Sequence, residues 1–201
     1  MSCSSIFPLT DCGISATESN KGAFMGLEFS ILHWFQSIHC APLDALAIFF
    51  DTIGAHGELW IALAIVLLLF KKTRKAGLAV AVALLLHLLI GDSFLKPLVA
   101  RPRPCDLDPS VAMLVPRPIG WSFPSGHTSS AFAAASALLF EKSRLAPYAL
   151  VLAAFIGLTR LYLYVHFPTD VLAGTVTGIV FGFLAAKLVD ALAARRAKHL
   201  S

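Results

Sequence analysis

Charged side chains are scarce in this sequence of 201 residues, and the scarcity excludes an ordinary soluble domain. Only 14% of the residues are Asp, Glu, Lys or Arg, whereas 57% are hydrophobic and the mean hydropathy is +0.77. A soluble domain carries about 25% charged residues. Because long apolar runs form membrane-spanning helices, the sequence predicts an all-α integral membrane protein.

Cysteine clusters and a cleavable leader are also missing. The four cysteines, Cys3, Cys12, Cys40 and Cys105, show neither the spacing of metal ligands nor a disulfide framework, so we expect free thiols. Residues 1–20 are polar and small, without a basic start followed by an apolar core. We therefore expect no cleaved signal peptide, and the first apolar segment would serve as an uncleaved insertion signal.

The chain also lacks a linker and internal repeats. We expect one domain, residues 21–201, preceded by the polar N-terminal segment 1–20. The net charge is +4. Most of the cations flank apolar runs, which favours a role in orienting helices over nucleic-acid binding. These flanking cations are Lys71, Lys72, Arg74, Lys75, Lys142, Arg144, Lys187, Arg195, Arg196 and Lys198.

About six apolar segments are present, and they predict about six transmembrane helices. The segments cover roughly 24–53, 58–70, 76–95, 125–140, 146–164 and 168–191. A span needs about 20 residues, so the second and fourth segments would have to extend into their flanks. The first segment is broken near Ala41-Pro42, because proline disrupts a helix interior. Its first half either spans the membrane or lies in the interface.

Basic loops predict the orientation of these helices. Positive residues follow the second segment at 71–75, the fourth at 142–144 and the sixth at 195–198. If every segment spans, these sites share one side, which the positive-inside rule makes cytoplasmic. The loops after the third and fifth segments then lie on the other face. We therefore expect a cell (inner or plasma) membrane protein whose polar clusters face away from the cytoplasm.

The first polar cluster joins Lys96 to Arg103. Lys96 closes the third segment, and Arg103 follows in the proline-rich loop 101–104. Prolines stiffen this loop. A guanidinium held in place can fork onto phosphate oxygens, while lysine acts as a point charge. Taken alone, the pair also fits an ordinary membrane interface.

The second cluster, Pro124-Ser125-Gly126-His127, begins an apolar helix. A helix start offers free N–H groups and a favourable dipole for phosphate. Gly126 allows close approach of the backbone, Ser125 adds a hydroxyl donor, and His127 is placed to protonate a leaving oxygen. A helix cap with a histidine bonded to its neighbours is the simpler alternative.

The third cluster contains Arg160, His166 and Asp170. Arg160 ends the fifth segment, and Asp170 lies four residues after His166 at the start of the sixth. At that spacing the carboxylate can bond one ring nitrogen and leave the other free, which orients a histidine nucleophile. A surface ion pair at a helix start is the alternative.

Taken together, the clusters have a fixed order and internal spacing. They read KPLVARPRP, PSGH and TRLYLYVHFPTD. The pattern resembles the phosphatidic acid phosphatase type 2 (PAP2) superfamily of membrane phosphatases, which shares its site with acid phosphatases and vanadium haloperoxidases. The motifs of that superfamily have the form K-x6-R-P, P-S-G-H and S-R-x5-H-x3-D. Thr159 stands where serine is usual, and it keeps the hydroxyl.

The resemblance covers about residues 80–190 and implies a lipid phosphatase on the helical core of that superfamily. His166 would attack phosphorus to form a phosphohistidine, Asp170 would orient it, and His127 would protonate the leaving lipid oxygen. No metal or cofactor is expected, because protein cations stabilise the charge. The residues expected to hold the phosphate are Lys96, Arg103, Ser125, Gly126 and Arg160.

Further polar residues surround these motifs. Arg101 and Arg117 are extra cations in the same loop, and we expect them to hold a second phosphate and so favour diphosphate lipids. Asp92, one helical turn before Lys96, either pairs with it in the empty site or is solvated. Asp51 borders the first outer turn, where interface solvation is favoured over a place in the pocket.

Several functions remain open at this point. Undecaprenyl diphosphate is the first expected substrate, followed by phosphatidylglycerophosphate and phosphatidic acid. A lipid phosphotransferase is an alternative reaction. A non-catalytic lipid carrier on the same fold is disfavoured, because a relative without activity would be expected to lose a nucleophile or a cation. The expected partners are a lipid phosphate and the bilayer, without nucleic acid, and the sequence leaves the oligomeric state unknown.

Overall fold

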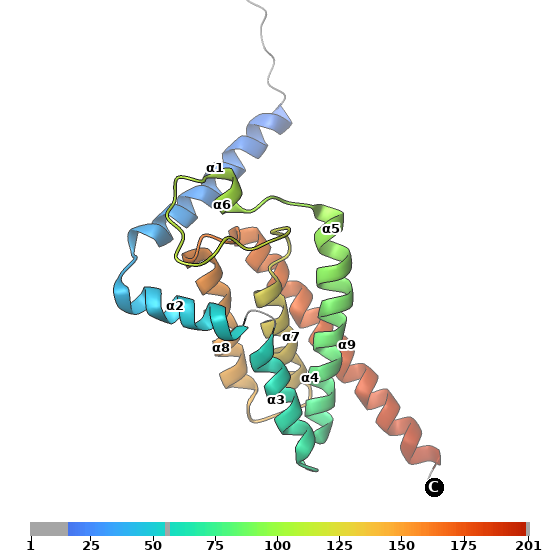
Figure 1. Cartoon of the computed structure of the whole chain (residues 1–201). Coiled ribbons are helices and arrows are strands. Elements are labelled where there is room, and N and C mark those ends of the chain that lie inside the picture. Colours follow the sequence, from blue (N-terminus) through green and yellow to red (C-terminus); the bar gives the residue numbers. More distant parts are fainter. Residues whose placement is uncertain (1–15, 55–56, 200–201) are drawn as a thin grey trace, which may run out of the picture.

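The computed structural model of the protein describes residues 16–54 and 57–199, and every regular element in these parts is a helix. In chain order these are α1 (Ala16–Ser37), α2 (Ala41–Gly54), α3 (Glu58–Leu69), α4 (Arg74–Leu86), the π-helical stretch η1 (His87–Leu95), α5 (Lys96–Val99), α6 (Pro104–Leu107), α7 (Gly126–Phe140), α8 (Ala146–Tyr162) and α9 (Pro168–His199). Figure 1 shows a bundle with α7 between its neighbours. The predicted all-α class is confirmed.

Helix α7 forms the centre of the bundle because its side chains are small. Ala133, Ala134 and Ala137 are fully buried in the core that α3, α4, α8 and α9 build around it. Helix α9 approaches α7 so closely that a Cβ atom on Gly178 would lie 2.5 Å from the carbonyl oxygen of Ser129. Small residues allow this backbone approach, which replaces bulky side-chain packing in membrane helices.

Helices α4, η1 and α5 form one long rod along the side of the bundle (Figure 1). The rod and α6 together form a candidate membrane span, Arg74–Leu107. The nine residues of η1 are wound as a π-helix, a form that is uncommon and often occurs at functional sites. It brings His87 and Asp92 to the same side of the rod, within 3.3 Å of each other.

The described residues contain two helices that are long and apolar enough to cross a membrane, Arg74–Leu107 and Pro168–Arg196. A third span results if α2 and α3, which are bent by 57°, are taken as one. The six predicted spans are therefore not confirmed. Helix α3 has 12 residues and α7 has 15, fewer than the roughly 20 that a full crossing needs.

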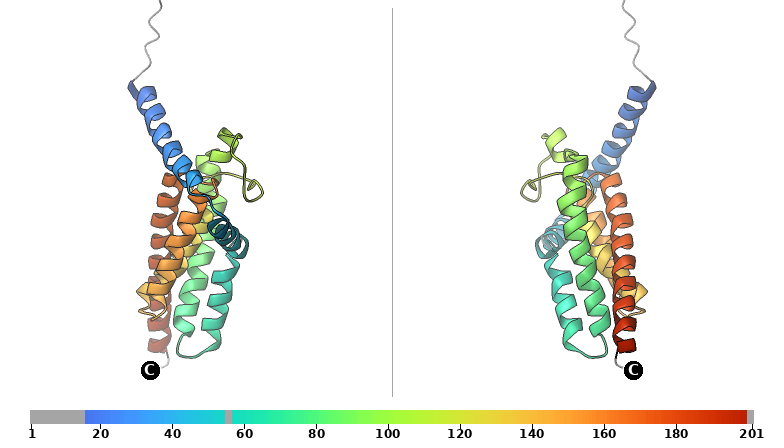
Figure 2. Two further views of the ribbon diagram at one scale, coloured as in Figure 1. Left: turned by 90° about the vertical axis from the view of Figure 1, so that its left-hand side faces the viewer. Right: turned by 90° about the vertical axis from the view of Figure 1, so that its right-hand side faces the viewer.

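Helices α1 and α2 lie outside the main bundle, near the end that is uppermost in Figure 1, and Figure 2 shows α1 projecting from it at an angle. The predicted break in the first segment is confirmed, because the chain leaves the helix between Ser37 and Ala41. Helix α1 begins at Ala16, inside the predicted segment 1–20. Residues 1–15, with Cys3 and Cys12, lie outside the described residues, whereas Cys40 and Cys105 are free thiols.

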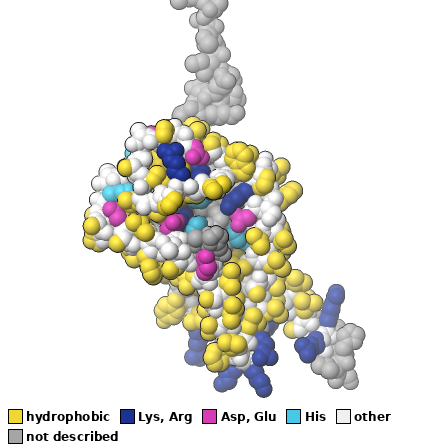
Figure 3. All heavy atoms as spheres, in the orientation of Figure 1, with side chains coloured by type: hydrophobic (Ala, Val, Ile, Leu, Met, Phe, Trp, Pro, Cys, Tyr) yellow, Lys and Arg dark blue, Asp and Glu magenta, His cyan; other side chains and the backbone are white. Residues whose placement is uncertain are grey.

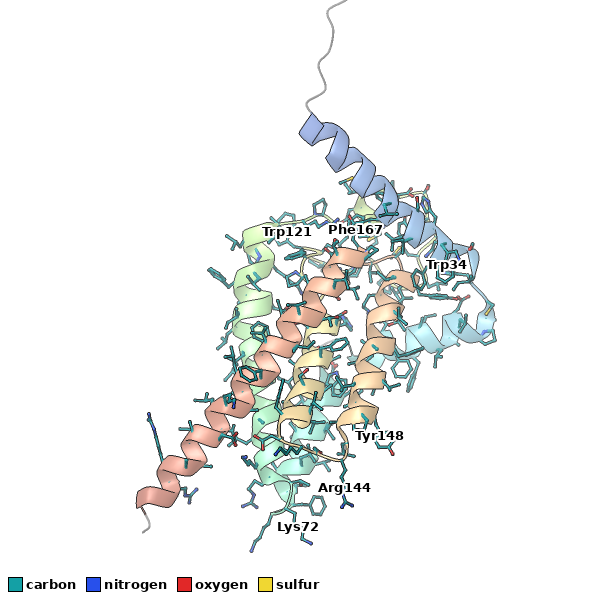
Figure 4. The ribbon with its side chains drawn as sticks, turned by 180° about the vertical axis from the view of Figure 1, so that it is seen from behind. Trp34, Lys72, Trp121, Arg144, Tyr148 and Phe167 are labelled. Carbon is teal, nitrogen blue, oxygen red and sulfur yellow. The ribbon has the colours of Figure 1, made fainter. Side chains whose placement is uncertain are left out.

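The two ends of the bundle differ in chemistry. Figure 4 shows Lys72 and Arg144 at one end, and Trp34, Trp121 and Phe167 at the other. The predicted polar clusters lie at the second end, as the loop arrangement requires. This separation is typical of a protein held across a bilayer with basic loops on one side.

Candidate active site

A cavity of about 800 Å³ is lined by residues from all three predicted clusters. Figure 3 shows histidine, acidic and basic side chains around a hollow in the upper half of the molecule, above mostly hydrophobic flanks. Ile61 of α3 and Leu84 and Leu88 of the α4–η1 rod add an apolar wall. Such a wall suits a ligand with an anionic head and a hydrocarbon tail. The ionisable lining residues are Asp51, His87, Asp92, Lys96, Arg103, Arg117, His127, Arg160 and His166.

His166 lies between α8 and α9 and presents one ring nitrogen to this cavity. Arg103 Nη1 is 3.2 Å from His166 Nε2. Because a guanidinium can only donate, Nε2 must accept, so the proton of the neutral ring is on Nδ1. Burial lowers the pKa of His166 to about 4, while Asp170 opposes this change and Arg103 and Arg160 add to it. The ring is therefore neutral at pH 7, with a lone pair on Nε2.

Ser122 connects His166 to Asp170. The distance from His166 Nδ1 to Asp170 Oδ2 is 3.8 Å, too long for the direct hydrogen bond that the sequence predicts. Ser122 Oγ lies 3.3 Å from Nδ1 and donates to Asp170 Oδ2 at 2.5 Å. Since its own proton goes to Asp170, Ser122 is left to accept the Nδ1 proton. The predicted orientation of His166 by Asp170 thus runs through a serine that sequence reasoning missed.

Asp170 itself is fixed by backbone contacts at the start of α9. Its Oδ2 accepts the Phe167 N–H at 2.8 Å, and its carbonyl oxygen accepts the Ser125 N–H at 3.0 Å. The second bond joins the beginnings of α7 and α9. The carboxylate is completely buried, so its orientation depends on hydrogen-bond partners in the protein rather than on solvent.

Arg103 is held rigidly by carbonyl oxygens of the loop around it. Its Nε donates to Gly120 at 2.9 Å, its Nη2 to Trp121 at 3.2 Å and its Nη1 to Val165 at 3.0 Å. These three bonds fix the Arg103 guanidinium beside His166 Nε2. A fixed guanidinium of this kind suits phosphate oxygens in a planar, forked arrangement.

Arg160 is the second buried guanidinium of the cavity, with 1% of its surface exposed. Its Nη1 donates to Asp51 Oδ1 at 2.6 Å, and its Nη2 donates to Thr159 Oγ1 at 3.0 Å. Thr159 thus uses the hydroxyl that it shares with serine. Asp51 lines the cavity, so the expectation that it is merely solvated at the interface is wrong.

Lys96 supplies the third cation, beside the start of α7. Its Nζ pairs with Asp92 Oδ1 at 2.6 Å, so the predicted pairing of these two residues is confirmed. A Cβ atom on Gly126 would lie 3.0 Å from this nitrogen and 3.2 Å from Asp92 Oδ1. Glycine therefore lets the lysine head group lie against the first turn of α7.

His127 faces the same cavity from the first turn of α7. Its Nε2 is buried and makes no hydrogen bond among the residues that the structure describes, the nearest carboxylate oxygen being Asp51 Oδ1 at 4.0 Å. A buried polar atom without a partner is costly. Its position in the wall of a cavity fits a bond to a bound ligand.

Two of the residues predicted to bind phosphate do not reach the cavity wall. Ser125 is buried with its hydroxyl 2.9 Å from Thr128 Oγ1, and it is not among the lining residues. Arg101 also lies outside the lining, while Arg117 is part of it. The structure therefore does not bring Arg101 and Arg117 together as the predicted second phosphate site requires.

Comparison with known proteins identifies the family. A model of the PAP2 superfamily matches residues 73–193. The chain belongs to the PAP2 superfamily. All three motifs on which the resemblance rests lie within the matched region, and each contributes residues to the wall of the cavity described above.

Similar proteins with known names are lipid phosphatases. An undecaprenyl-diphosphatase of Sulfolobus acidocaldarius is 30% identical over 172 residues, which cover 85% of this chain and 81% of that protein. A lipid A 4'-phosphatase of Bacteroides thetaiotaomicron is 32% identical over 183 residues, covering 84% and 80%. The crystal structure of Aquifex aeolicus LpxE matches with a TM-score of 0.69 and 31% identity, covering 80% of this chain and 95% of that one. This PAP2 protein is thus an integral membrane phosphatase that acts on lipid phosphates.

Proposed function

We propose that the protein removes the terminal phosphate of undecaprenyl diphosphate, without a metal, through a phosphohistidine on His166. The observation that carries the proposal is the arrangement of two histidines on one cavity. His166 presents an unprotonated Nε2, and His127 presents an Nε2 without a partner. This is the pair that a nucleophile and a general acid require.

In the first step, His166 Nε2 attacks the terminal phosphorus and forms a P–N bond. The P–O bond to the bridging oxygen breaks, and His127 gives a proton to that oxygen. Burial and the nearby cations Arg160 and Lys96 hold the pKa of His127 below its usual value, so the ring takes up this proton when the anionic phosphate binds beside it. Undecaprenyl phosphate leaves. The Nδ1 proton of His166 stays on the ring, where Ser122 and, through it, Asp170 stabilise the charge that develops.

In the second step, His127 takes a proton from water as the water oxygen attacks phosphorus. The P–N bond breaks, its electron pair returns to His166 Nε2, and inorganic phosphate is released. His127 is then protonated again for the next cycle. One histidine thus acts as acid and then as base.

Three cations stabilise the transferred phosphoryl group in this proposal. Lys96, Arg103 and Arg160 line one cavity, and the N–H groups at the start of α7, beginning with Gly126, add a helix N-terminus. Asp92 and Asp51 pair with two of the cations. Phosphate oxygens replace these carboxylates when the substrate binds. Ser125 contributes its hydroxyl only if the bond to Thr128 breaks.

The second phosphate of the substrate is assigned to Arg117. This residue lines the cavity, and it forms no ion pair within the part of the chain that the structure describes. The apolar residues of α3 and the α4–η1 rod leave room for the beginning of the isoprenoid chain. A cavity of about 800 Å³ is large enough for a diphosphate and several carbons.

The choice of substrate is supported by the relative named undecaprenyl-diphosphatase, which aligns with most of this chain. A second candidate, the removal of a phosphate from lipid A, is supported by the relative named lipid A 4'-phosphatase at similar identity. Both substrates combine a phosphate with hydrocarbon chains, so the cavity chemistry fits either. We further propose that the site faces away from the cytoplasm, because the basic loops lie at the opposite end.

The test is phosphate release by the purified protein in detergent containing EDTA. Undecaprenyl diphosphate, lipid A, phosphatidylglycerophosphate and phosphatidic acid are offered side by side. We expect release to be fastest from undecaprenyl diphosphate and to fall by at least about 1,000-fold in His166→Ala. His33→Ala, which removes a histidine outside the cavity, is the matched control and should keep activity. Release that survives His166→Ala or that EDTA abolishes would refute the mechanism.

A further inference from the structure

The buried carboxylate of Glu28 contacts residues beside the candidate active site, although its helix lies outside the region that matches the PAP2 superfamily. Glu28 belongs to α1, which precedes the residues that match the PAP2 superfamily, yet only 3% of it is exposed. Its Oε2 pairs with Arg101 Nη2 at 2.5 Å, and its Oε1 accepts from Thr169 Oγ1 at 2.5 Å. A buried acid on a peripheral helix thus bonds directly to the beginning of α9.

Arg101 connects this carboxylate to Asp170. Its Nη1 donates to Asp170 Oδ1 at 2.8 Å and to Thr169 Oγ1 at 2.7 Å. Its guanidinium also stacks on the Phe167 ring, with the central carbon 4.0 Å from the ring centroid. The Arg101 guanidinium is therefore occupied by these contacts and does not face the cavity.

The result is a row of alternating charges that ends at the proposed nucleophile. Glu28 is followed by Arg101, Arg101 by Asp170, and Asp170 by Ser122 and His166. An arginine paired with Asp170 weakens the field that this carboxylate presents to His166. A second carboxylate on the far side of Arg101 offsets the positive charge. In buried surroundings such charges are weakly screened, so their effects extend beyond the first neighbour.

We propose that Glu28 and Arg101 are positioning residues that orient Asp170 and set the negative charge with which it supports His166 during phosphoryl transfer. This inference rests on the proposed function, in which His166 is the nucleophile. Helix α1 then supports catalysis indirectly, by helping to position Asp170. Neither residue touches substrate: Arg101 acts through Asp170, and Glu28 acts through Arg101.

The proposal predicts opposite effects for the two charges. The other groups that face His166 are Arg103, Arg160 and His127. These remain unchanged in the test variants. Loss of the Glu28 charge leaves Arg101 unbalanced, which makes the protonated form of His166 less favourable. Loss of the Arg101 charge leaves an extra anion and has the opposite sign.

The experiment uses the full chain with Glu28→Gln, Arg101→Gln and the double variant, each of which keeps the approximate shape of the side chain. For Glu28→Gln we expect the rate of phosphohistidine formation in a single turnover to fall about tenfold, with KM changed less than about twofold. The acid midpoint of kcat/KM should move to lower pH. In Arg101→Gln it should move to higher pH, and the double variant should return towards the wild-type midpoint.

If Arg101→Gln fails to fold because Glu28 is left buried and unpaired, the comparison of Glu28→Gln with the double variant gives the same sign test. Asp108→Asn is the matched control. Asp108 also holds α1, through His33 and Tyr164, but makes no contact with Asp170. It should leave the acid midpoint unchanged.

An unchanged midpoint and rate in Glu28→Gln would overturn the inference, as would equal shifts in Glu28→Gln and Asp108→Asn. Both results are distinct from failure of the proposed function. If the proposed function failed instead, His166→Ala would remain active both alone and combined with Glu28→Gln.

Discussion

At the scale of single residues, the proposed chemistry depends on which nitrogen of His166 carries the proton. Arg103 requires Nε2 to be an acceptor, and Ser122 accepts the proton on Nδ1 while donating its own to Asp170. The tautomer that leaves a lone pair towards the cavity is thus fixed by partners on both sides of the ring. The sequence motif gives the histidine and the carboxylate, but not the serine between them.

Ser122→Ala tests this link directly. Removing the hydroxyl leaves His166 Nδ1 and Asp170 Oδ2 3.8 Å apart with no bridging atom, so the ring loses its orientation and its charge stabilisation. We expect kcat to fall on the order of 10- to 100-fold with KM nearly unchanged. Steady-state kinetics on the preferred lipid provide the measurement.

The matched control for that variant is Ser129→Ala, which removes another buried hydroxyl from the same region. Ser129 bonds Thr177 between α7 and α9 and does not line the cavity. It should keep nearly full kcat. Equal losses in the two variants would show that Ser122 matters only for packing.

Most of the residues that line the candidate site could be predicted from the sequence, but the contacts between them could not. The three motifs together, and their resemblance to the PAP2 superfamily, predicted His127, His166 and the three cations, because the motifs carry the residue types that phosphoryl transfer needs. The structure does not support the predicted phosphate-binding role of Arg101. Its place in the sequence puts it near Arg103 but cannot reveal that its guanidinium pairs with Glu28. Ser122 and Glu28 carry no local signal, because their importance comes from contacts made in the folded chain.

At the scale of helices, the close approach of α7 and α9 brings the two halves of the site together. Their beginnings carry His127 and Asp170, and the Ser125 N–H joins them by donating to the Asp170 carbonyl oxygen. Below this point, glycines of α9 lie against α7 at distances that exclude a side chain. Packing in the middle of the bundle therefore determines the geometry at its end.

Gly178→Ala should disturb this packing. The new Cβ atom would lie 2.5 Å from the Ser129 carbonyl oxygen and 2.7 Å from Phe132 Cβ, so the helices must separate. We expect a loss of about 1–3 kcal/mol in stability and a lower thermal midpoint in detergent. Thermal unfolding followed by circular dichroism measures the change.

Gly26→Ala serves as the control, because nothing lies within 4 Å of a Cβ atom at that exposed position of α1. Alanine favours a helix over glycine by up to about 1 kcal/mol, so this variant should be unchanged or slightly more stable. A Gly178→Ala protein as stable as the wild type would contradict the packing account.

Helix boundaries were predictable where the chain carries clear stop and start signals. The fourth segment was placed at 125–140 and α7 covers Gly126–Phe140, while the fifth and sixth segments begin with α8 and α9 at residues 146 and 168. Hydropathy could not distinguish a helix that spans lipid from one enclosed by other helices. Helix α7 is apolar because the bundle surrounds it, and its 15 residues do not by themselves make a span.

At the scale of the whole molecule, the two ends of the bundle have different roles. Basic residues such as Lys72 and Arg144 gather at one end, and the cavity opens near the other (Figures 3 and 4). By the positive-inside rule we propose that the basic end faces the cytoplasm. The substrate phosphate would then be hydrolysed on the outer side of the membrane while its hydrocarbon chain stays in the lipid.

Cysteine labelling in intact cells tests this orientation. Ile119→Cys, in the loop beside the cavity where the native side chain is fully exposed, and Lys72→Cys, in the turn between α3 and α4, are placed in a variant without the four native cysteines. A thiol reagent that cannot cross membranes should label position 119 and leave position 72 unlabelled until the cells are opened. The reverse pattern would place the site in the cytoplasm.

Trapping the phosphorylated enzyme tests the proposed phosphohistidine intermediate most directly. Protein incubated with a lipid substrate carrying a ³²P-labelled terminal phosphate is quenched in alkali, which preserves phosphohistidine, and is digested and sequenced by mass spectrometry. The phosphohistidine mechanism predicts acid-labile label on His166, formed in EDTA and absent from His166→Ala. Turnover without labelled protein, or label on another residue, would contradict it.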